Sequence, residues 1–286
     1  MPENEQMGVK ITEAQKSQYH RNAFVLPITA LSQEEVADYR SSLEAFERQQ
    51  GKLITGMDAR YKSHTLLPWS NRLVRHPAIL DAVEEIIGPD ILVWTSTFFV
   101  KEPHSDAVTL WHQDWTFFGL RPHEHITAWV ALSNASEEAG CMQFIPAEGA
   151  AREMRHQPRA DPNSINGGGQ RIVEPFDEST AVYATLHPGQ FSLHNTLCIH
   201  SSAPNRSDDR RIGLGISYIP AHVRHIGTLP VSAMLVRGED QYGHFELEPD
   251  PSGDYEVDAA RHAEIYRRYR AAYNEQVRMH EAEALT

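Results

Sequence analysis

Cysteine is nearly absent from this chain of 286 residues, with Cys141 and Cys198 as the only two. Two thiols that form no CxxC pair cannot build a structural zinc site alone, and they exclude a disulfide-rich secreted scaffold. We expect both to be free, buried thiols in a reducing compartment. The N-terminal segment has no basic region followed by an apolar run, so no secretory signal is expected.

Basic side chains are also scarce, because 26 Lys and Arg stand against 39 Asp and Glu, for a formal net charge of −13. Binding to a nucleic-acid backbone needs clustered Lys and Arg, so we expect no nucleic-acid partner. No stretch approaches the roughly 18 consecutive apolar residues of a membrane span. We therefore expect a cytoplasmic monomer or homodimer whose partner is a small molecule.

Helical signals come first along the chain and strand signals later. Thr12–Gln15 and Ser32–Glu35 match the capping-box spacing, and Pro77 opens a third helix over 78–87. From Ile91 onward the chain has short runs rich in β-branched and aromatic residues, separated by turn clusters, which predict strands. These runs are 91–100, 108–118, 125–133, 141–146, 179–186, 189–195 and 211–220.

This pattern predicts a mainly β fold with flanking α-helices, a sandwich or jelly roll rather than alternating βαβ units. We expect one domain over residues 1–286, with N-terminal helices in 11–88, a jelly-roll core in 91–225 and a C-terminal helix over 257–283. The segment 159–171 is expected to be a long loop of the kind that often forms a lid.

His112 and Asp114 form the first candidate metal site. They lie two residues apart in an aromatic run with strand character, and residues i and i+2 of a strand point to the same side. Two His and one carboxylate on one face of an octahedron hold Fe(II) in non-haem oxygenases. The third ligand must come from a distant strand, and His200 is our candidate.

Three other pairs share the spacing of His112 and Asp114, but in poorer settings. His104 and Asp106 lie in a polar turn, and His244 and Glu246 lie in an acidic segment that we expect to be exposed. A third pair, His262 and Glu264, lies in the expected C-terminal helix, where positions i and i+2 diverge.

Arg211 follows His200 by eleven residues and opens a strand-like run. An arginine presents the planar, permanently charged fork that binds a carboxylate through two hydrogen bonds, as a dicarboxylate cosubstrate requires. Ser202 can donate its hydroxyl to the same carboxylate. Arg210, in contrast, is expected in a solvated turn with local ion pairs to Asp208 and Asp209.

The chain has an HxD motif at His112 and, about ninety residues later, an HxS motif at His200, with Arg211 eleven residues beyond that histidine. This order resembles the phytanoyl-CoA dioxygenase family of 2-oxoglutarate-dependent oxygenases. Matching segments are YHRNAFVLPI, WHQD, ITAWVALSNASEEAGCMQFIP and HSSAPNRSDDRRIGLGISYI, within about residues 11–225. The resemblance implies a double-stranded β-helix, a distorted jelly roll of cupin-like form.

The resemblance also implies a set of site residues and a reaction. Fe(II) would bind at His112, Asp114 and His200, and 2-oxoglutarate at Ser202 and Arg211. Other cosubstrate positions implied in this way are Trp129, Thr97 and Thr109. With O₂, the enzyme would hydroxylate or otherwise oxidise a substrate and release succinate and CO₂. Related halogenases replace the carboxylate by a small residue, so Asp114 favours hydroxylation.

The chain departs from the family at Pro146-Ala-Glu-Gly149, where relatives often have Pro-Gly-Ser-His. Any role carried over from that Ser or His is therefore in doubt. The expected metal ligands lie outside this segment and are not affected.

The substrate is less defined by the sequence. A natural-product intermediate, an amino acid or a phosphonate is favoured, since few basic residues are available to bind a large polyanion such as an acyl-CoA ester. The candidate substrate residues are Trp115, Phe117, Phe118, Arg121, His194 and Asn195. Arg121 is equally compatible with a solvated turn, and the other five with packing in the core.

Two other classes of function remain open at this point. One is a zinc- or manganese-dependent hydrolase or isomerase on the same barrel, which gives Ser202 and Arg211 no role. The other is a non-catalytic binding module of the same fold, which predicts a broken metal triad.

Overall fold

The computed structural model describes residues 10–158, 161–166 and 170–283. Helices are α1 Glu13–Asn22, α2 Gln33–Gln50, α3 Pro68–Val74, α4 Pro77–Ile87, α5 Trp115–Phe118 and α6 Tyr255–Glu283. Strands are β1 Phe24–Thr29, β2 Ile91–Lys101, β3 Thr109–His112, β4 Leu120–Arg121, β5 Ile126–Ala131, β6 Met142–Ile145, β7 His156–Pro158, β8 Gln170–Ile172, β9 Val182–Ala184, β10 Gln190–Asn195, β11 Ile199–Ser202, β12 Arg211–Pro220, β13 Arg224–His225, β14 Ser232–Arg237 and β15 Glu246–Leu247.

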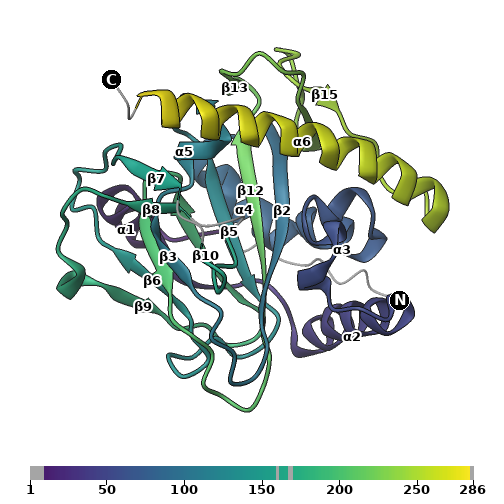
Figure 1. Cartoon of the computed structure of the whole chain (residues 1–286), viewed down its shortest axis with the longest axis horizontal. Coiled ribbons are helices and arrows are strands. Elements are labelled where there is room, and N and C mark those ends of the chain that lie inside the picture. The colour runs from purple at the N-terminus through teal and green to yellow at the C-terminus, as the bar shows by residue number, and fades with distance from the viewer. Residues whose placement is uncertain (1–9, 159–160, 167–169, 284–286) are drawn as a thin grey trace.

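The N-terminal helices begin where their capping signals predicted. Both capping boxes are formed, with Thr12 and Ser32 each accepting a backbone N–H from the residue three positions on, at 3.2 Å. Pro77 is the first residue of α4. These helices lie against one side of the strands (Figure 1).

Two antiparallel sheets form the double-stranded β-helix that the sequence predicted. The larger has the strand order β1-β10-β5-β12-β2-β14-β15 and the smaller the order β3-β11-β6-β9. All strand pairs are antiparallel except β14 with β15. Strands that are distant in the sequence, such as β5, β10 and β12, thereby become neighbours.

Alternation along the paired parts of β5 and β12 decides which side chains reach the space between the sheets. On β12, Ile212, Leu214 and Ile216 belong to the core beneath the N-terminal helices. Because successive side chains point to opposite faces, Arg211 and Gly213 face the other way, toward the smaller sheet. The same rule turns Thr127 and Trp129 of β5 inward.

Gly213 makes room for Trp129. A Cβ at this position would lie 1.9 Å from Cζ2 of the Trp129 indole, which crosses from the neighbouring strand. Any larger residue at Gly213 would displace the ring. The indole therefore lies flat across β12 and forms one wall of the interior.

The run 108–118 is not one strand, and this expectation was wrong in detail. Only Thr109–His112 is extended, while Trp115–Phe118 is a helical turn. Asp114 already has helical dihedral angles, φ −72° and ψ −28°. His112 and Asp114 therefore converge through a strand-to-helix turn rather than through the two-residue period of a strand.

The C-terminal helix α6 crosses one end of the two sheets (Figure 1). Its Tyr269 and Ala272 pack in a cluster with Trp94 of β2 and Leu120 of β4. No helix of the described residues is long and apolar enough to cross a membrane. The expected lid, 159–171, lies partly outside the described residues.

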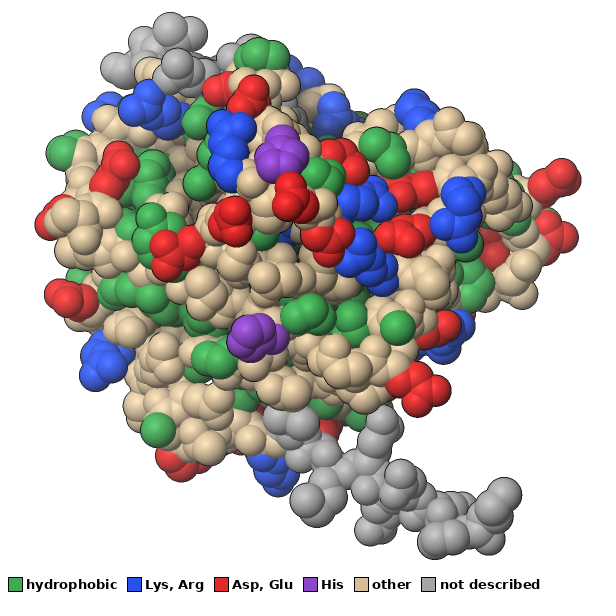
Figure 2. Space-filling view, turned by 90° about the horizontal axis from the view of Figure 1, so that it is seen from below, with side chains coloured by type: hydrophobic (Ala, Val, Ile, Leu, Met, Phe, Trp, Pro, Cys, Tyr) green, Lys and Arg blue, Asp and Glu red, His purple; other side chains and the backbone are tan. Residues whose placement is uncertain are grey.

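Acidic and basic side chains are interspersed on the face shown in Figure 2, and no continuous basic patch forms there. This distribution agrees with the excess of acidic residues in the sequence.

Candidate metal centre

His112, Asp114 and His200 converge in the interior between the two sheets. Each offers one ligand atom, and the three atoms lie within 4.8 Å of one another. Oδ1 of Asp114 is 3.5 Å from Nε2 of His112 and 3.8 Å from Nε2 of His200. His112 and His200 are register partners across β3 and β11. The expected convergence of these three side chains is confirmed.

Both imidazoles are oriented by their second ring nitrogen. Nδ1 of His112 lies 2.9 Å from the carbonyl of Leu110, and Nδ1 of His200 lies 3.0 Å from the carbonyl of Cys198. A carbonyl can only accept, so Nδ1 carries the proton in each ring. Nε2 is left with a free lone pair that faces the shared space, as a metal ligand requires.

Gln113 holds the turn that carries Asp114. Its amide nitrogen donates to the carbonyls of Arg152 and Leu197, and its oxygen accepts from the indole of Trp115. The side chain is buried, so these bonds tie the turn to distant parts of the chain. Asp114 follows directly and can turn its carboxylate toward the two imidazoles.

The electrostatics of the centre favour an ionised carboxylate and neutral imidazoles. Burial acts to raise the pKa of Asp114, but the neighbouring imidazoles of His200, His112 and His194 outweigh it and hold that pKa well below the usual value. Burial, with the nearby His112, lowers the pKa of His200 well below its usual value. These are the protonation states in which both groups bind metals.

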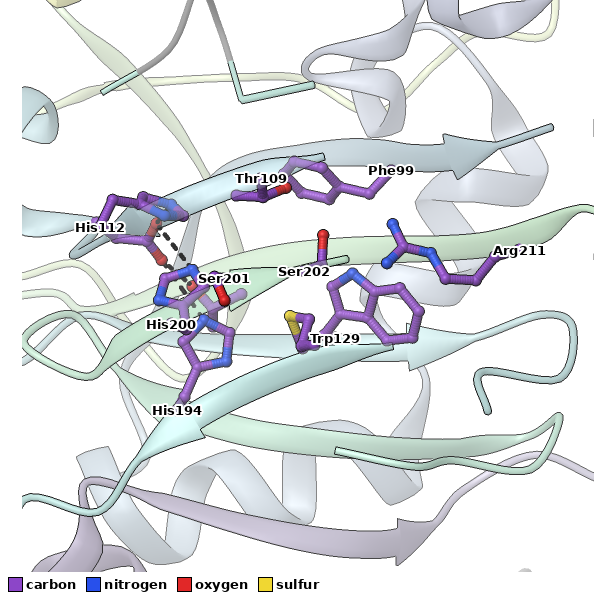
Figure 3. Close-up of a pocket in the computed structure, with 12 residues that line it drawn as sticks. Phe99, Thr109, His112, Trp129, His194, His200, Ser201, Ser202 and Arg211 are labelled. Atoms are coloured by element: carbon purple, nitrogen blue, oxygen red, sulfur yellow. Dashed lines mark hydrogen bonds and ion pairs between the residues drawn. The ribbon is translucent and has the colours of Figure 1, made fainter. Parts of the chain in front are cut away.

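A buried cationic side chain, that of Arg211, lies in the same pocket as the metal centre, at the end away from the histidines (Figure 3). Arg211 is 1% exposed, and its guanidinium lies 5.3 Å from the centre of the Trp129 ring. One guanidinium nitrogen donates to the carbonyl of Gly140 at 2.6 Å, whereas Nε has no partner. Ser202, two residues beyond His200 on β11, lines the same pocket.

Lys101 adds a second buried cation that the sequence analysis missed. It is the register partner of Arg211 across β2 and β12, and its ammonium donates to Oγ of Ser202 at 2.7 Å. Burial and the charge of Arg211 lower the pKa of Lys101 to about 6, and burial also lowers the pKa of Arg211 to about 10. In the described part of the chain neither cation forms an ion pair, which points to an anionic ligand.

The cavity that joins these groups is small, with a volume of about 50 Å³. Its lining comprises Phe99, Thr109, His112, Asp114, Thr127, Trp129, Met142, His194, His200, Ser201, Ser202 and Arg211. Thr97, an expected cosubstrate residue, is buried on β2 but is not part of this lining.

Most of the candidate substrate residues lie elsewhere. Trp115 and Phe117 pack against α6, with ring centroids 5.4 Å from His280 and Tyr273. The helical turn α5, hidden under α6, explains why these aromatics do not line the pocket.

The remaining candidates also make structural contacts. Phe118 packs on Trp94, and the guanidinium of Arg121 lies 5.2 Å from the Trp115 ring. The side-chain amide of Asn195 accepts the backbone N–H of Leu197 at 2.9 Å. His194 alone of this group lines the pocket.

The competing His-acid pairs do not assemble a metal site. His104 is exposed and contacts Asp208 at 2.9 Å, while Asp106 contacts Arg206. His244 is exposed, and Nε2 of His262 is bonded to the carbonyl of Tyr61.

Arg210 does not lie in the solvated turn that was expected. Its guanidinium forms ion pairs with Glu47 at 2.8 Å and Glu102 at 2.9 Å, and its side chain is only 13% exposed. It thereby ties α2 and the end of β2 to the start of β12, outside the pocket lining.

Comparison with known proteins agrees with the resemblance seen in the sequence. The family profile of phytanoyl-CoA dioxygenase (PhyH) matches residues 19–213. L-proline trans-4-hydroxylase of Streptomyces griseoviridis is 26% identical over 248 residues, which cover 72% of this chain and 88% of that protein. A probable alpha-ketoglutarate-dependent hypophosphite dioxygenase of Stutzerimonas stutzeri is 27% identical over 182 residues. That alignment covers 62% of each protein, so it spans just under two thirds of this relative's length.

Solved structures show the same fold over nearly the whole chain. The non-heme monooxygenase ThoJ superimposes with a TM-score of 0.82 and 29% identity, covering 92% of this chain and 99% of its own. CytC3 with Fe(II) and alpha-ketoglutarate superimposes with a TM-score of 0.62 at 22% identity, covering 84% of this chain and 93% of its own. At that identity the second match supports the fold alone.

Proposed function

This chain belongs to the phytanoyl-CoA dioxygenase family, and from that premise we propose that it is an Fe(II)- and 2-oxoglutarate-dependent oxygenase of small molecules. His112, Asp114 and His200 hold the iron. Arg211, with Ser202 and Lys101, binds the distal carboxylate of 2-oxoglutarate. When bound, the iron supplies the oxidising chemistry that couples decarboxylation of 2-oxoglutarate by O₂ to oxidation of the substrate.

One observation carries this proposal. Three metal-ligand atoms within 4.8 Å of one another share a pocket with a buried arginine that has no acidic partner among the described residues. The donor set fits Fe(II), because two neutral imidazoles and one carboxylate bind on one side and leave positions for a chelating cosubstrate. The arginine fits the far end of a dicarboxylate.

The protein's own residues hold and orient the reactants. The carbonyls of Leu110 and Cys198 fix the tautomers of the two imidazoles. Trp129, held flat by Gly213, lines the path between the metal centre and Arg211 (Figure 3). Burial of this path keeps water away from the reacting groups.

The substrate proposed here is a small molecule, such as an amino acid, a phosphonate or a natural-product intermediate. The cavity that joins the metal ligands and Arg211 is small, about 50 Å³, which favours a compact substrate. Two relatives carry names that specify proline and hypophosphite as substrates, both of which are compact. The single-domain organisation, the cytoplasmic location and the monomeric or homodimeric state stay predictions.

The alternatives that the sequence left open give the cations no role. A zinc- or manganese-dependent hydrolase does not need Arg211 and Ser202 together in a buried pocket, with the ammonium of Lys101 donating to Ser202. A binding module without metal does not need two imidazoles oriented by their Nδ1 atoms toward one carboxylate. Neither alternative is favoured by any contact in the site.

The test of this function uses the purified full-length protein. Under anaerobic conditions, addition of Fe(II) and 2-oxoglutarate should produce a weak charge-transfer band in the visible. In air, one of a panel of amino acids, phosphonates, betaines and natural-product cores should stimulate succinate release and gain one oxygen by mass spectrometry. The absence of both the band and succinate would refute the proposal.

Lys101 should make cosubstrate binding depend on pH. Its pKa of about 6 in the free pocket means that it is mostly neutral above that pH. A bound carboxylate favours the charged ammonium, so binding takes up a proton, and affinity should fall as the pH rises from about 6 to 8. One linked proton limits the change to about tenfold per pH unit.

The dissociation constant of 2-oxoglutarate, measured from the visible band with iron-saturated protein, checks this dependence. The variant Lys101→Met should bind more weakly at pH 6 and lose most of the slope. Metal binding has its own pH dependence, so the slope of the Lys101→Met variant is subtracted from that of the wild-type protein. An equal slope in both proteins would show that Lys101 does not contact the cosubstrate.

A further inference from the structure

Asp114 is held differently from the two histidines of the metal centre. His112 and His200 lie on paired strands, and each ring is fixed by a backbone carbonyl. Asp114 precedes the helical turn α5, and its side chain makes no capping hydrogen bond. The backbone hydrogen bonds of the sheet therefore leave the rotation of its carboxylate unfixed.

Two polar side chains of the larger sheet meet the outer oxygen of this carboxylate. Oγ1 of Thr127 donates to Oδ2 of Asp114 at 3.1 Å, and Nε2 of His125 lies 3.1 Å behind that hydroxyl. Nε2 of His194 lies 3.6 Å from the same Oδ2. Thr127 and His194 are register partners across β5 and β10, so their side chains lie on one face of the sheet.

His194 is a buried imidazole without a hydrogen bond. It is 1% exposed, and neither ring nitrogen has a partner. Burying an unsatisfied polar group destabilises the folded protein. Its ring lies 4.8 Å from that of His200 and lines the pocket, yet its nitrogens are not among the converging ligand atoms. An orienting contact to Asp114 would account for this placement.

We propose that His194 is a positioning residue for the metal carboxylate. Its Nε2–H donates to Oδ2 of Asp114 and, with Thr127, turns the carboxylate so that Oδ1 would face a metal held by His112 and His200. The inference rests on the proposed function, because a carboxylate bound through one oxygen leaves the positions that 2-oxoglutarate and O₂ require. Outer groups that orient metal ligands in this way typically contribute about 10–100-fold in metal affinity or activity.

The test compares three substitutions of His194 in the full-length protein. The amide nitrogen of a glutamine reaches roughly the position of Nε2, whereas that of an asparagine reaches roughly the position of Nδ1. We expect His194→Phe and His194→Asn to weaken binding of Co(II) to the apoprotein by about 10–100-fold. His194→Gln should recover most of the affinity. The visible absorption of Co(II) reports binding without any turnover.

A second readout follows the coordination itself. The charge-transfer band of the anaerobic Fe(II)–2-oxoglutarate complex should be shifted or weakened in His194→Asn and His194→Phe, and restored in His194→Gln. Thr127→Val, which removes the other donor to Oδ2, should alter the band in the same direction. If His194→Phe does not fold by circular dichroism, the glutamine and asparagine variants still decide the question.

Wild-type Co(II) affinity and an unchanged band in all three variants would overturn the inference. Equal losses in His194→Gln and His194→Asn would also overturn it, because no particular nitrogen would then matter. A wild-type protein that binds Co(II) but gives no band with Fe(II) and 2-oxoglutarate would instead contradict the proposed function. The order of the Co(II) affinities would still test the role of His194.

Discussion

Replacing Asp114 by alanine is expected to abolish substrate oxidation. The substitution leaves two neutral imidazoles and removes the negative charge of Asp114, so Fe(II) binding should fall by more than the roughly 100-fold typical of losing an outer partner of a ligand. Asp114→Asn is the matched variant, because it keeps the shape of the side chain and removes its charge. We expect it to resemble Asp114→Ala. Metal content after dialysis and succinate release in air measure the two effects.

His104→Ala is the control for this experiment. His104 and Asp106 have the same spacing as His112 and Asp114, but they are exposed and contact different partners, Asp208 and Arg206. Iron binding and succinate release should therefore stay close to the wild-type values. Loss of iron from the His104 variant, with iron retained by Asp114→Ala, would mean that the wrong pair was assigned.

The convergence of the candidate metal ligands was predictable because their signal combines several residue types at fixed spacing. His112, Asp114, His200 and Arg211 were all found from the sequence, and the structure brings them to one pocket. The physical reason given for the first pair was nevertheless wrong. Asp114 has a helical backbone, so a strand period does not align it with His112. The motif pattern shared with the family, rather than the two-residue period of a strand, therefore supports the choice of His112 and Asp114.

Lys101 could not be assigned from the sequence because its role depends on pairing between distant strands. In the sequence it is one charge that follows the apolar run 91–100, where it reads as the end of a strand. Only the antiparallel register of β2 with β12 places it beside Arg211. The same holds for His194, which meets Asp114 through the pairing of β10 with β5.

The aromatic candidates failed for a different reason. The sequence shows that Trp115 and Phe117 follow the metal ligands, but it does not show what covers them. The helix α6, more than a hundred residues later, packs on α5 and converts these side chains into core. A periodic pattern identifies an apolar face, whereas the partner of that face is a tertiary property.

Replacing Arg211 by alanine should raise the concentration of 2-oxoglutarate needed for half-maximal activity by about 100-fold or more. Arg211 is 1% exposed, and breaking a buried charge pair costs about 3–5 kcal/mol, which corresponds to at least two powers of ten in affinity. The KM for 2-oxoglutarate and the dissociation constant from the anaerobic band measure this loss. Arg211→Lys should recover only part of it, because an ammonium cannot form the bidentate contact.

Arg210→Ala separates the loss of cosubstrate binding from a general loss of stability. Arg210 joins Glu47 to Glu102, so its removal should lower the thermal unfolding temperature. It lies outside the pocket lining, and the KM for 2-oxoglutarate should therefore change little in the folded protein. Two arginines that are adjacent at the start of β12 would thus have different effects, since only Arg211 faces the metal centre. A similar rise in KM for both variants would refute the assignment of Arg211 as the carboxylate ligand.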